Sequence, residues 1–182
     1  MALINTTTTG VLGSTFYGDG SGDLTVQQNG VTVNKITAAP TFSAYQSSGG
    51  QSITNSTVTK VTFDVEEWDT ANCFDNSTNY RFTPNVAGYY QVNSQLSLNT
   101  LSPTEAQFFI YKNGIQYRRG MRLEGTSLEP YLVNSSLVFL NGTTDYIEMY
   151  AFQTSGGTAT TENHSPNGFR GTYFQAAMVR SA

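Results

Sequence analysis

The chain has 182 residues and a formal net charge of −4 at pH 7, and only 12% of its residues are charged. This length suits one domain with a hydrophobic core and an appendage. The scarcity of charge and the many aromatic and glycine residues favour strands and turns, so we expect an all-β protein. The negative net charge argues against nucleic acid as a partner, because phosphate binding needs a concentrated positive surface.

Neither disulfide bonds nor a membrane anchor is expected. The single Cys73 cannot form an internal disulfide bond, so stability must come from packing or assembly. No stretch approaches the roughly 18 to 20 apolar residues of a membrane-spanning helix, and the first residues lack the pattern of a signal peptide. We therefore expect no membrane span, and a chain that is made and assembled in the cytoplasm of a host cell or exported by another route.

Residues 1–37 differ in character from the rest of the chain and are expected to form an extended arm. Two strand-like stretches, 24–27 and 31–36, flank the turn-forming pair Asn29-Gly30, which predicts a small hairpin at most. The arm is too poor in apolar residues to bury a core of its own, so we expect another protein or another copy of the chain to hold it. Its candidate anchoring residues are Leu12, Phe16, Leu24, Val31, Val33 and Ile36.

Residues 38–182 are expected to form the folded domain. Short strand patterns alternate with turns throughout this part, and Asn113-Gly114 suits a two-residue hairpin turn. Their number and spacing predict an antiparallel sandwich or jelly roll. The predicted strands cover 42–46, 57–65, 80–83, 89–99, 107–112, 115–121, 129–140, 146–153 and 171–180.

Several predicted strands have no charged face. In the stretch AGYYQVNSQLSLNT, residues 87–100, one alternating set is mostly apolar and suits a core, whereas the other set is a tyrosine followed by amide and hydroxyl groups. A similar pattern occurs in 146–153 and 173–179. Uncharged second faces of this kind are typical of an interface. The predicted interface residues are Tyr89, Tyr146, Tyr150, Phe152 and Tyr173.

The stretch FDVEEWDTANCFDNSTNYRFTPNVAGYYQV, residues 63–92, resembles the signature of the complement component 1q globular-head family. It has one extra residue between Phe74 and Phe82, and Val92 and Ser94 stand where that family usually has aromatics. The stretches 110–114, 137–150 and 174–178 extend the resemblance over residues 40–182. It implies the trimeric jelly roll that this family shares with tumour necrosis factor, with one sheet of each subunit facing the threefold axis. The signature positions are Phe63, Phe74, Phe82, Gly88 and Tyr90.

The arm is similar to segments that precede fibre and head-decoration domains of bacteriophages. Together the two resemblances imply a non-enzymatic structural protein of a phage virion, exposed on the particle surface. It would be a homotrimeric capsid decoration or cement protein, or a short fibre, with the arm bound to a capsid or tail protein. The alternative is a tail-fibre module that binds a glycan on the host surface.

Candidate catalytic and metal-binding groups are few. His164 lies in a predicted loop without a nucleophile pattern, and Cys73 reads as a small buried apolar group. The carboxylates of 66–75 could form a glycosidase pair or a calcium site, and those of 19–23 could form a calcium site. Solvated turns are the preferred interpretation of both stretches. We therefore expect no cofactor and no metal.

Arg118, Arg119 and Arg122 place three of the nine positive residues within five positions. Guanidinium groups pair in a bidentate manner with carboxylates, so this cluster could contact an anionic sugar or a neighbouring subunit. A solvated hairpin explains it equally well, and both interpretations stay open.

Overall fold

The computed structural model describes residues 15–18, 24–28, 31–36, 39–47, 50–99, 103–125, 130–162 and 170–182. The chain divides into two compact units, Met1–Ala39 and Pro40–Ala182. Each is considered by itself below.

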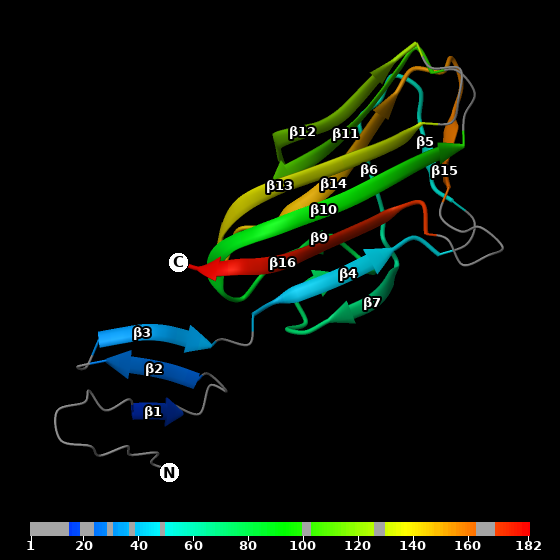
Figure 1. Ribbon diagram of the computed structural model, residues 1–182. Helices are drawn as coiled ribbons and strands as arrows, with labels where there is room; N and C mark the ends of the chain where they lie inside the picture. Colours follow the sequence, from blue (N-terminus) through cyan, green and yellow to red (C-terminus); the bar gives the residue numbers. More distant parts are fainter. Residues whose placement is uncertain are drawn as a thin grey trace. The chain divides into compact units, whose positions relative to one another are not determined.

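The first unit contains a three-stranded antiparallel sheet (Figure 1). Strand β2 (Leu24–Gln28) pairs with β3 (Val31–Ile36), which confirms the predicted hairpin. A third strand that was not predicted, β1 (Thr15–Gly18), pairs with the other edge of β2. Of the candidate anchoring residues, Leu12 lies outside the described residues and the others lie within these strands.

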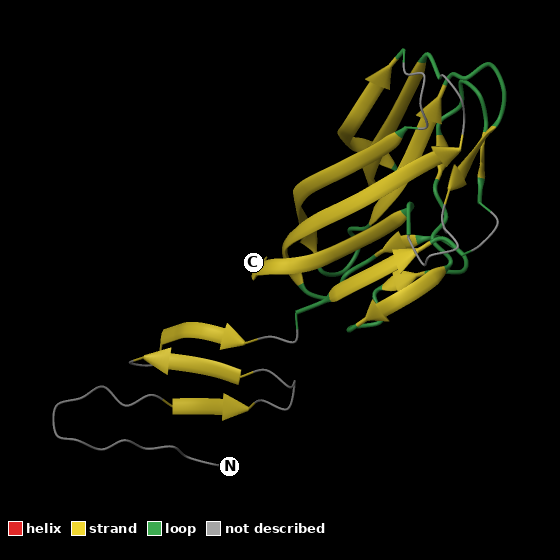
Figure 2. Ribbon diagram, turned by 45° about the vertical axis from the view of Figure 1, so that its right-hand side comes forward, coloured by secondary structure: helices red, strands yellow, loops and turns green. Residues whose placement is uncertain are grey.

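The second unit consists of two antiparallel sheets packed face to face (Figures 1 and 2), which confirms the predicted all-β jelly roll. The seven-stranded sheet contains β5 (Ser52–Ile53), β15 (Ala159–Glu162), β10 (Ala87–Asn99), β16 (Tyr173–Ser181), β4 (Thr41–Tyr45) and β7 (Val65–Asp69), with β13 (Tyr131–Asn141) on the other edge of β10. The six-stranded sheet contains β12 (Ile115–Glu124), β11 (Glu105–Lys112), β14 (Ile147–Gln153), β9 (Arg81–Phe82) and β8 (Phe74–Asp75), with β6 (Thr59–Lys60) also beside β14. No helix able to cross a membrane is found in the part of the chain that the structure describes.

Eight of the nine predicted strands are confirmed, with ends that shift by a few residues. The ninth, predicted over 57–65, is wrong: only Thr59–Lys60 and Val65 are in strands. The side chain of Gln51 accounts for the interruption. Its Oε1 accepts a hydrogen bond from the Thr62 N–H, and its Nε2 donates to the carbonyl oxygen of Lys60, at 2.9 and 2.6 Å. These bonds occupy backbone groups that a neighbouring strand would otherwise pair.

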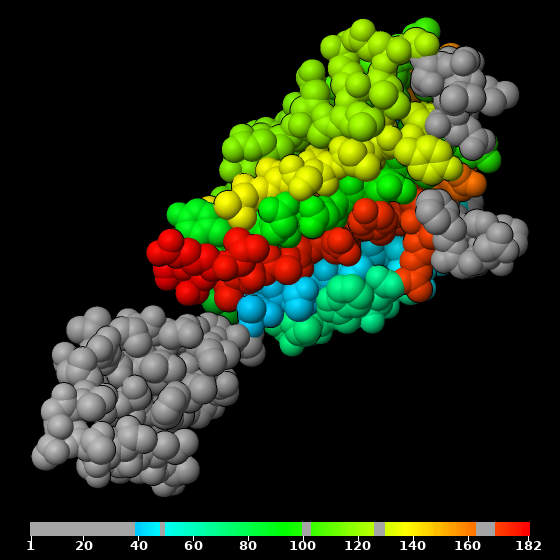
Figure 3. Space-filling view, in the orientation of Figure 1, coloured from blue at the N-terminus to red at the C-terminus, as the bar shows by residue number. Residues whose placement is uncertain are grey.

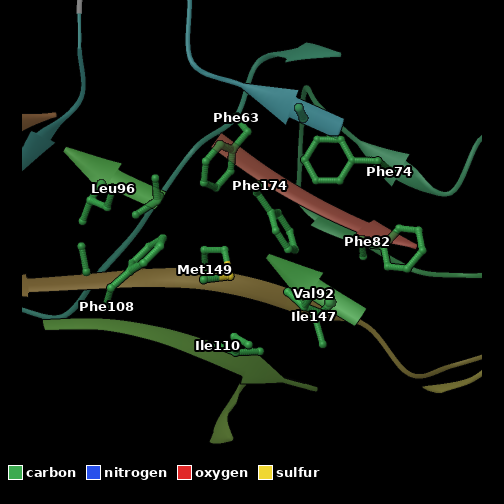
Figure 4. Packing of buried hydrophobic residues seen from close by; sticks show 14 of the residues in the cluster. Phe63, Phe74, Phe82, Val92, Leu96, Phe108, Ile110, Ile147, Met149 and Phe174 are labelled. Carbon is green, nitrogen blue, oxygen red and sulfur yellow. The ribbon is translucent and has the colours of Figure 1, made fainter. Parts of the chain in front are cut away.

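The core lies between the two sheets and is rich in aromatic rings (Figure 4). Phe42 is fully buried, stacks on Phe74 and Phe82 with ring centroids 4.6 Å apart, and meets Phe174 edge-on at 4.8 Å. Tyr90 is buried too, and its hydroxyl donates to the carbonyl oxygen of Val86 at 2.6 Å. All four aromatic residues of the signature, Phe63, Phe74, Phe82 and Tyr90, therefore belong to one cluster.

Gly88 is required by a close approach of two strands. The pairing of β10 with β16 shifts register between Tyr89 and Tyr90, which is the mark of a β-bulge. A Cβ atom at residue 88 would lie 2.4 Å from the backbone oxygen of Arg180. Because that neighbour is backbone, it cannot turn aside, and only glycine fits this signature position.

Candidate functional site

The outward face of the seven-stranded sheet carries most of the exposed apolar side chains. Ten large apolar side chains are exposed in the described part of the second unit, and seven of them lie on β7, β10, β13 and β16. We call this surface the apolar face. Its exposed apolar residues are Trp68, Tyr89, Tyr131, Val133, Leu137, Phe139 and Val179.

Strand register brings four of these residues, Tyr89, Leu137, Phe139 and Val179, together at one end of the sheet. Tyr89 pairs with Phe139 across β10 and β13, and their ring centroids are 5.4 Å apart. Gln91 lies opposite Leu137 on one side and Ala177 on the other. A depression of about 590 Å³ opens between Tyr89, Leu137 and the last residues of β16. This end of the apolar face thus offers both raised rings and a hollow for a partner's side chains.

The middle of the apolar face is polar but uncharged. The Nε2 of Gln91 donates to the Ser135 hydroxyl at 3.0 Å, and that hydroxyl donates to Oδ1 of Asn93 at 2.9 Å. The Nε2 of Gln95 donates to the carbonyl oxygen of Gly171 at 3.0 Å. These groups already have partners in their own subunit, which lowers the cost of removing them from water.

Charge is confined to the margins of this sheet. Neither β10 nor β13 contains a single Asp, Glu, Lys or Arg residue, although they are the two longest strands. Their bands run side by side with those of β16 and β4 across the surface in Figure 3. Long strands without charge are unusual on a surface that stays in water, since solvent-facing strand positions are ordinarily polar or charged.

The structure corrects one part of the predicted interface. Tyr146, Tyr150 and Phe152 were expected to share a face with Tyr89 and Tyr173, but β14 pairs with β11 in the six-stranded sheet. Their side chains therefore project from the opposite side of the sandwich. Alternation along a strand shows which residues share a face, but it does not tell to which sheet the strand belongs.

Sequence reasoning also missed residues of the apolar face. Every second residue of β13 from Tyr131 to Phe139 is exposed, and four of these five are apolar. The same alternation test that singled out 87–100 would have found them. Tyr173 is half-buried on the apolar face, where it pairs with Gln95 and Tyr45.

The three clustered arginines lie on the edge strand β12. The Nε of Arg122 is 2.8 Å from a carboxylate oxygen of Glu105, and its Nη2 contacts Glu124. The guanidinium of Arg118 lies over the ring of Tyr117, and that of Arg119 over the ring of Phe109. Arg122 is therefore neutralised within the chain, whereas Arg118 and Arg119 have no carboxylate partner among the described residues.

The acidic cluster holds turns in place. Asp69 accepts hydrogen bonds from the backbone N–H groups of Ala71 and Phe74, and Asp75 accepts from those of Ser77, Thr78 and Asn79. No group of three or more His, Cys, Asp or Glu residues that could hold a metal occurs among the residues the structure describes. Residues 19–23 and His164 lie outside those residues. Cys73 is buried, and burial raises the pKa of its thiol.

The Asp75 turn leads to a pH-dependent prediction. The hydrogen bond from Thr78 N–H, with those from Ser77 and Asn79, holds the pKa of the Asp75 carboxyl well below its ordinary value. Its ionised form therefore stabilises the fold above that ordinary value, and the contribution is lost as the pH falls through the range below it. We expect Asp75→Asn to lower the thermal unfolding midpoint at neutral pH, and to lower it much less below about pH 3. Equal losses at both pH values, measured by circular dichroism, would contradict this role.

No protein-family model and no curated protein sequence matches this chain. Solved structures share its fold. The globular domain of zebrafish complement 1qA protein aligns with a TM-score of 0.55 at 13% identity, over 79% of this chain and 99% of that chain. The Eiger TNF of S. frugiperda aligns with a TM-score of 0.56 at 9% identity, over 79% and 94% of the two chains. The PRD1 vertex protein P5 aligns with a TM-score of 0.54 at 16% identity, over 78% and 96%.

The fold is thus a C1q/TNF-like jelly roll, as the resemblance of residues 63–92 implied. The same fold occurs in a phage vertex protein.

Proposed function

We propose that the protein is a homotrimeric structural or attachment protein whose subunits meet through the apolar face. One observation carries this proposal: the charge-free strands β10 and β13 carry five of the ten exposed large apolar side chains of the described second unit. Apolar patches of this kind mark interaction surfaces on soluble proteins, and the buried centres of interfaces are poor in charge and rich in aromatics. Assembly would supply stability that a chain without disulfide bonds lacks.

We further propose that the trimer is part of a phage virion, as a capsid decoration or cement protein or a short fibre. The shared fold of the PRD1 vertex protein P5 supports this setting. The small sheet of the first unit supports an anchoring role for residues 1–37, because edge strands can extend a sheet of a capsid or tail protein through main-chain hydrogen bonds.

Sedimentation equilibrium of the full chain at micromolar concentration tests the assembly, and we expect the mass of three chains. A monomer mass would overturn the trimer. Immunogold electron microscopy of the particles tests the location, and label on the particle surface is the expected result.

Deletion of residues 1–37 tests the anchor. Every residue of the core cluster belongs to the second unit, so we expect the shortened chain to fold and to form the same oligomer as the full chain. It should no longer enter particles when it replaces the full chain during assembly. If the shortened chain is incorporated at full occupancy, the attachment surface lies in the jelly roll and the arm is not the anchor.

A further inference from the structure

The outward face of the six-stranded sheet carries a second, different surface, made of aromatic rings. Ile110, Met149 and Ala151 on β11 and β14 point into the core, so the alternate residues of these strands point outward. The rings of Tyr111 and Tyr150 stack with centroids 4.0 Å apart, and Phe109 meets Tyr111 edge-on at 6.4 Å. We call this row of rings the aromatic strip: its members Tyr111, Tyr146, Tyr150 and Phe152 are half-buried, and Phe109, at 3% exposure, is buried at its edge.

Cationic side chains flank the aromatic strip on both sides. The guanidinium of Arg81 lies 4.3 Å from the ring centroid of Tyr146, and that of Arg119 lies 5.9 Å from the ring centroid of Phe109. On the Arg81 side, Lys60 lies over Tyr150 and is paired with the buried carboxylate of Glu148. Among the described residues, Arg81 and Arg119 have no carboxylate partner. Their planar groups rest on rings, which fixes their position and leaves donors free for an anion.

The distribution of positive charge between the two sheets also favours an anionic ligand on the six-stranded sheet. The strands of the six-stranded sheet carry six of the nine Lys and Arg residues of a chain whose net charge is −4. The strands of the seven-stranded sheet carry one, Arg180. The positive residues of the six-stranded sheet are Lys60, Arg81, Lys112, Arg118, Arg119 and Arg122. Three of these six, Lys60, Lys112 and Arg122, are paired with carboxylates of the chain, which leaves Arg81, Arg118 and Arg119 as the charges complementary to an anionic ligand.

We propose that the aromatic strip and its flanking arginines bind an acidic saccharide of the uronic-acid type. The half-buried rings of the aromatic strip supply flat apolar contact for the faces of sugar rings, while Arg81 and Arg119 pair with the carboxylates. The proposal rests on the trimer in one respect: a trimer joined through the apolar face directs the opposite sheet outward, where a polymer can reach it. The low total of positive charge disfavours single-stranded nucleic acid, which would otherwise use the same combination of rings and cations.

Isothermal titration calorimetry of the full chain with a short oligogalacturonate tests this site. We expect saturable binding that weakens as salt is added, no binding of a neutral maltooligosaccharide, and weaker binding of oligothymidylate. Arg119→Gln should weaken binding about tenfold, because a charge-assisted pair is lost. The affinity of Arg119→Lys should lie between those of the parent and of Arg119→Gln. Arg180→Gln, on the other sheet, should leave the affinity unchanged.

Equal binding of the neutral sugar, tighter binding of oligothymidylate, or an Arg119→Gln affinity equal to the parent's would overturn the proposal. Thermal unfolding of each variant shows that it is folded, and Arg81→Gln provides a second variant on the other side of the strip. Sedimentation of the same samples separates the two proposals. A protein that is monomeric but binds the sugar would overturn the proposed trimer and support this site. A trimer that does not bind the sugar would overturn this site alone.

Discussion

Replacing Phe42 with alanine is expected to lower the free energy of unfolding by about 3 to 5 kcal/mol, the usual cost of truncating a buried phenylalanine. Phe42 comes from the short strand β4 but stands at the centre of the aromatic cluster, against Phe74, Phe82 and Phe174. These rings belong to both sheets, so they cannot close the space without moving the sheets together. A loss of this size is a large share of the stability of an ordinary domain.

Urea denaturation of the parent and the variant at one protein concentration measures the effect, and a fixed concentration keeps any oligomer linkage constant. Phe42→Leu is the matched control, because it keeps most of the apolar volume and should cost much less. Ile115→Ala at the exposed end of β12 should change stability by less than about 0.5 kcal/mol. If Phe42→Ala unfolds at the same urea concentration as Phe42→Leu, the ring stack is not the centre of the core.

The fold was predictable because the strands of the second unit follow local rules. Alternation of apolar residues located β10 and β16, and Asn113-Gly114 located the turn between β11 and β12, where both residues have positive φ. The interruption after Thr59–Lys60 could not be predicted, because it depends on hydrogen bonds from Gln51 that exist only once the chain has folded. The two-residue strands β5 and β8 are too short for any periodic pattern.

The candidate site was only partly predictable, for a different physical reason. The uncharged second face of β10 follows from its sequence, and so does the mostly aromatic second face of β14, whose one charged residue is Glu148. Which of them meet depends on long-range pairing: β10 lies between β13 and β16, whereas β14 lies beside β11. The sequence pattern therefore merged two surfaces that lie on opposite sides of the molecule. Separating them gives one face to the proposed assembly and the other to the proposed ligand.

Leu137→Glu is expected to dissociate the trimer at concentrations where the parent is fully assembled. Leu137 lines the depression of the apolar face, 51% exposed in the single subunit, on a strand without charge and opposite Gln91. In a trimer joined through this face, three new carboxylates would lose water without gaining partners, at a cost of about 3 kcal/mol or more for each subunit. The isolated subunit should remain folded, since an exposed position tolerates the change.

Ile115→Glu is the matched control. It is the same kind of change at an apolar residue that is 73% exposed, but on the opposite sheet. Sedimentation equilibrium should give a monomer mass for Leu137→Glu and a trimer mass for Ile115→Glu, while circular dichroism shows the same β-sheet content in both. If Leu137→Glu stays trimeric, the apolar face is not the contact between subunits. If Ile115→Glu dissociates instead, the contact lies on the six-stranded sheet, and the aromatic strip rather than the apolar face would be buried on assembly.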